Sequence, residues 1–260
     1  MEHIYFDHAA TTPVDARVLQ KMLPYFSDNF GNPNSQHWFG RRSVTAVDEA
    51  RDLIASLIGA KPGEIYFTSG GTESDNWALR GAAHAQAAKG KRLIVSAVEH
   101  PAMITTAKEL EKEGFEISFA PVDEYGRVDV QKLKELLRPD TVFVGVMKAN
   151  NEVGTIQPVA EISRLCRDRG ILFFTDAVQA AGALKIDVKE PAVDMLSFSA
   201  HKFYGPKGVG VLYIRSGLKM GKIITGGHQE RTMRGGTTNV PAIVGMAEAL
   251  RLAQEEREKS

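Results

Sequence analysis

The chain has 260 residues, of which 43% are hydrophobic and 25% are charged, a composition typical of one large or two small globular domains. Its 32 basic and 32 acidic residues cancel, so we expect neither nucleic acid nor a membrane surface as a partner. The single cysteine excludes an intrachain disulfide framework and a cysteine-based zinc site.

The sequence also gives expectations about cellular location. It contains no apolar run that approaches the roughly 20 residues of a membrane-spanning helix. The first residues lack the basic and apolar regions of a secretory signal, so we do not expect secretion. A lone cysteine fits a reducing compartment. These features predict a cytoplasmic protein.

Short β-branched or aromatic runs alternate with amphipathic segments, which predicts an α/β protein with a mostly parallel sheet. The first expected helix opens at Thr12 and Pro13 and runs to about Phe26. A second spans about 42–58. The expected strands are 64–68, 92–96, 115–119, 141–147, 171–175, 194–198 and 210–214. The remaining expected helices are 72–89, 101–113, 130–137, 159–169 and one from residue 241 into a charged terminal run.

The expected strand 194–198 is followed by Ser199, His201 and Lys202 and then by a Gly/Pro turn. A lysine at the mouth of a core is partly desolvated, so its amine can be neutral and form a Schiff base with an aldehyde cofactor. The neighbouring hydroxyl could bind a phosphate. Lysine side chains are mostly exposed, and alone Lys202 is equally consistent with a surface lysine at a strand end.

A glycine turn joins the expected strand 64–68 to the next helix through Gly70, Gly71 and Thr72. The glycines let the backbone approach a ligand, and the helix start offers free N–H groups to an anion. This pattern predicts a phosphate cradle that differs from a Walker loop and from GxGxxG. The alternative is an ordinary strand-to-helix turn with a threonine cap.

Three further side chains follow the ends of expected strands. Asp176 could pair with a protonated pyridine nitrogen in the crevice beyond the strands, or it could cap a helix. His100 could stack on an aromatic cofactor and move protons, or it could be an ordinary loop histidine. Asn151 could hydrogen-bond a ring hydroxyl, or it could belong to a turn.

Taken together, these segments supply an anion cradle, a stacking ring, an amide, a carboxylate and a lysine at successive strand ends. Those groups are the parts that a pyridoxal 5'-phosphate site requires. A metal site fits less well, because the seven histidines show no paired spacing like HExxH. We therefore predict no metal.

The chain resembles the cysteine desulfurases (NifS/IscS-like) of the class V, fold-type I pyridoxal-phosphate enzymes. The resemblance covers essentially the whole chain and follows an ordered set of motifs. These motifs lie at 5–13, 31–35, 68–74, 99–100, 150–154, 176–179 and 199–208.

This resemblance implies a fold-type I large domain with a seven-stranded, mostly parallel sheet sandwiched by helices. Residues 1–16 would belong to the small domain, and 17–260 would form the cofactor-binding large domain, ending in the inter-domain helix. Family members are longer and continue with a loop bearing a nucleophilic cysteine and an arginine for the substrate carboxylate. We therefore expect a truncated chain whose small C-terminal domain is largely absent, with apolar surface uncovered on the N-terminal segment and the last helix.

The resemblance also implies roles for individual residues. Lys202 would bind the cofactor aldehyde covalently, and His100 would stack on the ring. Asp176 would pair with the pyridine nitrogen. Phosphate contacts would come from Gly71, Thr72, Ser199 and His201, and ring-hydroxyl contacts from Asn151 and Gln179. Thr237 would reach the phosphate of a neighbouring subunit, which implies a homodimer.

The implied reaction converts L-cysteine to L-alanine and passes sulfur to an enzyme cysteine, for use in sulfur or iron–sulfur cluster metabolism. Cys166 shares a helical face with Val159 and Ile162, so we expect it to be a core residue rather than the nucleophile. The chain alone would then be weakly active or inactive. An iron–sulfur scaffold or another sulfur acceptor is an expected partner. The alternatives are a non-catalytic cofactor-binding or dimerisation module and a related class V aminotransferase or lyase.

Overall fold

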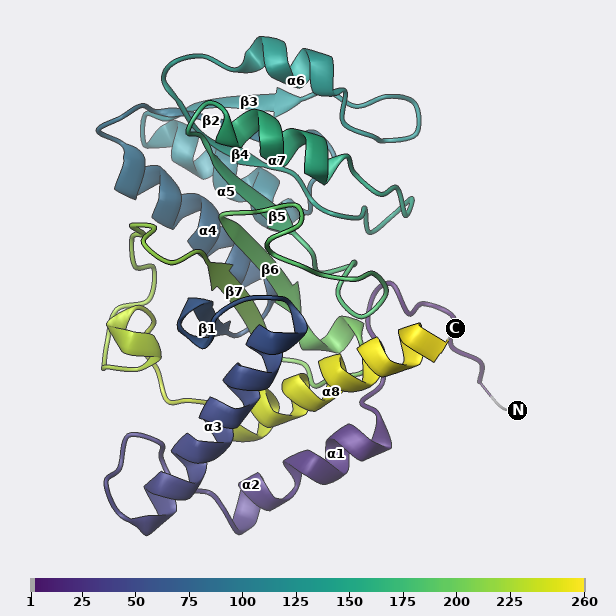
Figure 1. Ribbon diagram of the computed structural model, residues 1–260, viewed down its shortest axis with the longest axis vertical. Coiled ribbons are helices and arrows are strands. Elements are labelled where there is room, and N and C mark those ends of the chain that lie inside the picture. Colours follow the sequence, from purple (N-terminus) through teal and green to yellow (C-terminus); the bar gives the residue numbers. More distant parts are fainter. Residues whose placement is uncertain (1–2, 260) are drawn as a thin grey trace.

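A seven-stranded sheet forms the middle layer of the fold in a computed structural model that describes residues 3–259 (Figure 1). Its spatial order is β1-β7-β6-β5-β4-β2-β3. The strands are β1 (Ile65–Thr68), β2 (Arg92–Ser96), β3 (Glu116–Ala120), β4 (Thr141–Gly145), β5 (Leu172–Asp176), β6 (Met195–Ser199) and β7 (Gly210–Ile214).

The sheet is mostly parallel, as predicted. Strands β3, β2, β4, β5 and β6 pair in parallel, whereas β7 pairs antiparallel with both β6 and β1. Strand β1 therefore points in the same direction as the parallel strands. As a result, the carboxyl ends of β1, β2, β4, β5 and β6 meet at one edge of the sheet, where open α/β sheets bind ligands.

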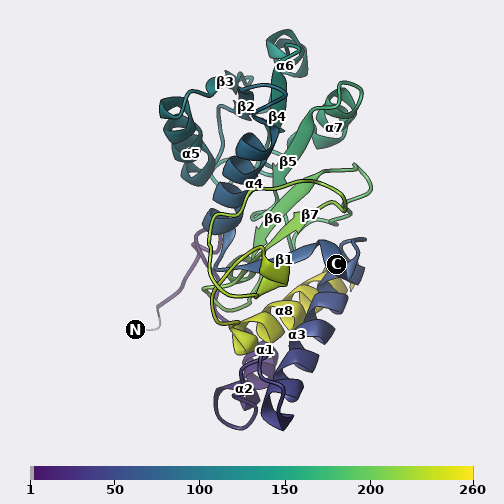
Figure 2. The ribbon, with the colours of Figure 1, turned by 90° about the vertical axis from the view of Figure 1, so that its left-hand side faces the viewer.

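Helices cover both faces of the sheet (Figure 2). The longer helices are α1 (Ala16–Met22), α3 (Trp38–Leu57), α4 (Gly71–Gln86), α5 (Pro101–Lys112), α6 (Val130–Leu136), α7 (Val159–Arg167) and α8 (Val240–Lys259). Helices α4 and α5 share one core with the sheet, and α1, α3, α6, α7 and α8 share the other. Side chains alternate accordingly along β6, because Met195 enters the first core and Leu196 the second.

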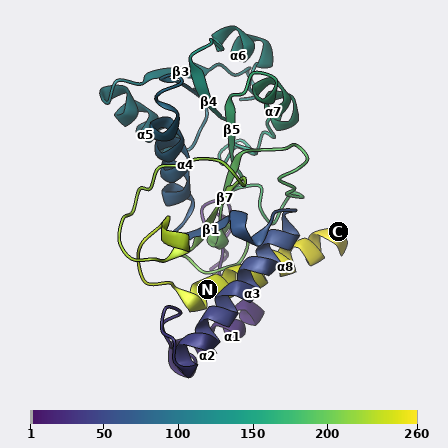
Figure 3. The same cartoon turned by 60° about the vertical axis from the view of Figure 1, so that its left-hand side comes forward.

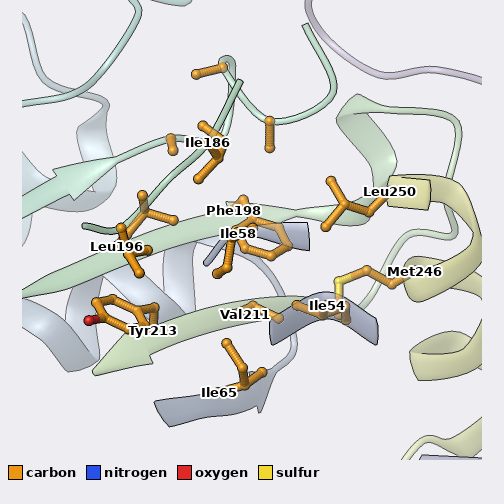
Figure 4. Packing of buried hydrophobic residues seen from close by; sticks show 14 of the residues in the cluster. Ile54, Ile58, Ile65, Ile186, Leu196, Phe198, Val211, Tyr213, Met246 and Leu250 are labelled. Carbon is orange, nitrogen blue, oxygen red and sulfur yellow. The ribbon is translucent and has the colours of Figure 1, made fainter. Parts of the chain in front are cut away.

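Helix α8 lies beside α3 and α1 (Figure 3) and is largely buried. Its Met246 and Leu250 enter the core that contains Ile54 and Phe198 (Figure 4). The expectation that the last helix exposes its apolar face was therefore wrong, because α1 and α3 cover that face. On the N-terminal segment the expectation was correct, since Ile4 and Phe6 are 77% and 87% exposed.

The first helix begins later than predicted. Asp15 rather than Thr12 caps α1, because the Asp15 side chain accepts a hydrogen bond from Arg17 N at 2.8 Å. The segment also splits, with α2 (Pro24–Ser27) following α1 at a proline that cannot continue the hydrogen-bond ladder. Thr12 is instead buried against the turn that contains Lys202, where its hydroxyl donates a hydrogen bond to His201 O.

Strands β2 and β7 have the predicted ends, and the ends of the other strands differ from the predicted ones by at most two residues. Cys166 is a fully buried core residue on α7, as expected. Among residues 3–259, no helix is long and apolar enough to cross a membrane. The assignment of 1–16 to a small domain and of 17–260 to a large one stays a prediction, and residues 1, 2 and 260 lie outside the described part of the chain.

Candidate active site

One cavity of about 500 Å³ lies at the edge of the sheet where the parallel strands end. This volume is ordinary for a small-molecule site. Nine of the ten residues predicted from the sequence line it, although they are spread over more than 130 residues of chain. They are Gly71, Thr72, His100, Asn151, Asp176, Gln179, Ser199, His201 and Lys202.

Lys202 ends a short 3₁₀ turn (Ala200–Lys202) that directly follows β6. Its Nζ donates hydrogen bonds to the backbone oxygens of Ala9 and Ala10, the second at 2.9 Å. Burial lowers the pKa of Lys202 from its ordinary value, although the charge of Asp176 opposes this effect. The amine is therefore easier to deprotonate than that of a surface lysine, which favours nucleophilic chemistry.

A buried pair of carboxyl groups, Asp176 and Asp75, lies opposite the lysine. Asp176 ends β5 and accepts a hydrogen bond from Val178 N at 2.7 Å. Asp75 lies on α4 and accepts one from Ser197 Oγ at 2.6 Å. Burial raises the pKa of both groups, and repulsion from Asp176 raises that of Asp75 further, so Asp75 is the better proton holder. His100 and Lys202 favour the ionised form of Asp176.

A third buried acid, Glu99, links two segments next to the cavity. Its Oε1 accepts hydrogen bonds from Ser96 Oγ at 2.5 Å and from Met147 N at 2.6 Å. Its Oε2 is buried and has no hydrogen-bond partner among the described residues. Burial raises the pKa of Glu99 to about 8, and the nearby charge of Asp176 contributes. Glu99 thus ties the end of β2 to the segment after β4.

The start of α4 forms an anion cradle at one end of the cavity. Gly70 precedes the helix with no capping side chain, so the first N–H groups face outward. A Cβ placed on Gly71 would lie 2.7 Å from Val178 Cγ2, so a larger residue at this position would have to displace Val178. Burial lowers the pKa of the adjacent His201, and the charges of Lys202 and Lys207 add to this effect.

His100 and Gln179 are held by local hydrogen bonds. His100 caps α5, where its Nδ1 accepts from Ala102 N at 3.1 Å. Gln179 Nε2 donates to Ala9 O at 2.8 Å. Asn151 Nδ2 donates to Glu152 Oε1 at 2.6 Å. All three side chains border the cavity from loops that follow strand ends.

Thr237 is the one predicted residue that does not line this cavity. It borders a smaller one of about 200 Å³, together with Ser69, Gly208 and Gln229. Arg234, three residues earlier, links this loop to the cradle, because its guanidinium donates to Glu73 at 2.8 and 2.9 Å. The position of Thr237 outside the cavity is consistent with the predicted role in a neighbouring subunit, and that role stays a prediction.

Sequence reasoning did not single out Asp75, Glu99 or Thr12 as parts of the site. For Asp75 a signal existed, because it lies four residues after Gly71 and so on the same helical face. The burial of Glu99 depends on contacts with residue 147, and that of Thr12 on contacts with residues 201 and 204. No local pattern reveals such long-range contacts.

Comparison with known proteins identifies the family. The family described as "Aminotransferase class-V" matches residues 4–259. The chain belongs to this family. Within it, the chain is 52% identical over 256 residues to "Cysteine desulfurase IscS" of Dictyoglomus turgidum and 51% identical over 257 residues to that of Methanosarcina thermophila. The predicted relationship to the IscS/NifS cysteine desulfurases is therefore confirmed.

These relatives are longer than the chain. The alignments cover 98% and 99% of this chain but 65% and 64% of the two relatives, so the chain spans slightly less than two thirds of their length. Solved structures agree with the fold. A "NifS-like protein" has a TM-score of 0.97 at 43% identity, covering 99% of this chain and 71% of the other. "SspA in complex with cysteine" has a TM-score of 0.92 at 40% identity, covering 99% and 77%.

Proposed function

We propose that the chain is the cofactor-binding part of a cysteine desulfurase, which uses pyridoxal 5'-phosphate to convert L-cysteine to L-alanine and to pass on the sulfur. The observation that carries this proposal is the convergence of Lys202, Asp176, His100 and the α4 cradle on one cavity. The family relationship and the cysteine complex of a similar protein support the same substrate.

The cavity residues fit the cofactor. The α4 cradle, with Thr72, Ser199 and His201, would hold the phosphate. Asp176 would pair with the ring nitrogen, and His100 would stack on the ring. Asn151 and Gln179 would contact the ring hydroxyl. The tight packing of Gly71 on Val178 leaves the backbone, rather than a side chain, to face the anion.

When bound, pyridoxal phosphate supplies an aldehyde that condenses with amines and a ring that accepts electrons from the substrate α-carbon. Lys202 Nζ would hold the cofactor in the resting enzyme and, once released, would move the α-proton. The buried Asp75 would keep its proton, so that Asp176 carries the negative charge facing the ring. The buried Asp176 carboxylate would thus stabilise a positive charge on the ring nitrogen.

The sulfur must pass to a thiol other than Cys166. Cys166 is fully buried on α7, and burial raises the pKa of its thiol to about 12. A thiolate, the form that attacks sulfur, is therefore scarce at neutral pH. We propose that the sulfur passes first to an enzyme cysteine outside these 260 residues and then to an iron–sulfur scaffold or another sulfur-acceptor protein. A homodimer in the cytoplasm, with Thr237 reaching across, completes the proposal.

Two measurements test this function. Purified protein mixed with pyridoxal phosphate should gain visible absorbance, and Lys202→Ala should not. Alanine release from L-cysteine, with dithiothreitol as thiol acceptor, should be weak in this chain alone, should require Lys202 and should be unchanged in Cys166→Ser. Absorbance without alanine release would favour the non-catalytic binding or dimerisation module. Turnover of another amino acid in preference to cysteine would favour a class V aminotransferase or lyase.

A further inference from the structure

Thr12 contacts both sides of the Lys202 turn, although 189 residues separate it from His201. Its Oγ1 donates a hydrogen bond to His201 O at 2.9 Å and accepts one from Tyr204 N at 2.8 Å. Its backbone N–H donates to the same His201 oxygen at 3.0 Å. Thr12 itself is 3% exposed, so its hydroxyl has little access to water and depends on these partners. The Thr12 hydroxyl therefore bonds to backbone groups on both sides of Lys202 in the sequence.

The turn 201–204, to which Thr12 bonds, has a strained backbone. Tyr204 has φ +62°, the left-handed region, which costs a residue other than glycine roughly 1–2 kcal/mol. Such conformations persist only where the surroundings hold them. Two bonds do so here, because Tyr204 N donates to Thr12 and Tyr204 O accepts from Asp15 N at 3.0 Å. If these two hydrogen bonds were lost, the turn would relax, and the backbone from which the Lys202 side chain extends would no longer be fixed.

The residues just before Thr12 contact the site directly. Ala9 and Ala10 present their backbone oxygens to Lys202 Nζ, and Thr11 Oγ1 lies 3.1 Å from His201 Nδ1. The segment 9–12 therefore contacts the Lys202 amine and backbone groups of two residues that flank Lys202, His201 and Tyr204. Fixing the segment at Thr12 fixes both contacts at once.

We propose that Thr12 is a positioning residue for Lys202, whose hydroxyl holds the turn 201–204 so that Nζ lies in the cavity beside Ala9 and Ala10. This inference rests on the proposed function. Loss of the hydroxyl removes the acceptor of the Tyr204 N–H and frees the turn. The amine then spends less time in the reactive position, and covalent capture of the aldehyde slows.

The experiment follows pyridoxal phosphate capture in cofactor-free protein rather than turnover. We compare wild type with Thr12→Val, which keeps the shape but not the hydroxyl, with Thr12→Ser, which keeps the hydroxyl, and with Thr45→Val on the exposed face of α3. The rate of visible absorbance gain is recorded, the adduct is fixed with borohydride, and the modified lysines are identified by mass spectrometry. Folded fractions from thermal unfolding normalise the rates.

Thr12→Val should capture the cofactor about tenfold more slowly, the effect of about one lost hydrogen bond, and should shift the adduct from Lys202 to surface lysines. Thr12→Ser and Thr45→Val should stay within about twofold of wild type. Equal rates and equal Lys202 selectivity in Thr12→Val would overturn the inference, as would an equally slow Thr12→Ser. A wild type that forms no Lys202 adduct would overturn the proposed function and the inference with it.

Discussion

Replacing Glu99 with glutamine should make folding stability less dependent on pH. In the folded protein burial raises the pKa of Glu99 to about 8, against an ordinary value of 4.5. Between these values the folded state keeps a proton that the unfolded state has lost, so raising the pH favours unfolding. The stabilisation is complete below pH 4.5 and is lost as the pH rises toward 8. Glutamine cannot ionise, so this contribution disappears.

The magnitude follows from one proton. The free energy of unfolding of wild type should fall relative to Glu99→Gln by up to about 1.4 kcal/mol per pH unit, or about 5 kcal/mol over the interval. Asp75 and Asp176 are present in both proteins, so the difference between the curves reports Glu99 together with its interaction with these two acids.

The assay is urea unfolding of cofactor-free protein at several pH values from 5 to 8. Glu124→Gln, at an exposed site, is the control and should follow wild type. Parallel stability curves for wild type and Glu99→Gln would refute the reasoning, since they would show that Glu99 titrates alike in both states.

Three further predictions concern the cradle, an ion pair and the cysteine. Gly71→Ala should weaken pyridoxal phosphate binding about tenfold, because its Cβ would lie 2.7 Å from Val178. The control Gly63→Ala, where no neighbouring atom lies within 4 Å, should leave binding unchanged. Equal affinities of the two variants in spectrophotometric titrations would contradict this prediction. Arg51→Met should lower the free energy of unfolding, measured with urea, by about 3–5 kcal/mol, because it leaves the buried Glu230 carboxylate without its 2.8 Å partner. A cost no larger than that of Arg17→Met, which removes an exposed ion pair, would show that the Arg51–Glu230 pair does not stabilise the fold. Folded protein should react with a thiol reagent at pH 8 only as fast as it unfolds, and rapid labelling of Cys166 would count against its burial.

Much of the fold was predictable because its signals are local. Apolar runs at 92–96 and 210–214 gave strands with the observed ends, and Pro101 marked the start of α5. The first helix was misplaced because Thr12 resembles a helix cap in sequence but uses its hydroxyl on residues 201 and 204. The burial of α8 depends on α1 and α3, which local periodicity does not reveal.

The candidate site divides in the same way. Residues that follow strand ends, such as Asp176 and Lys202, could be predicted because parallel strands bring their carboxyl ends together. The buried acids Asp75 and Glu99 were harder to predict. Asp75 lies on the same helical face as Gly71, but its burial depends on a contact with Ser197, 122 residues away. Glu99 likewise depends on Met147, 48 residues away.

The most direct test of the proposed chemistry is the identity of the residue that captures the cofactor. Protein equilibrated with pyridoxal phosphate is reduced with borohydride, digested and analysed by mass spectrometry. We expect a single pyridoxyl group on the peptide that contains Lys202. Labelling spread over surface lysines, or labelling that leaves Lys202 unmodified, would contradict the assignment of this cavity as the cofactor site.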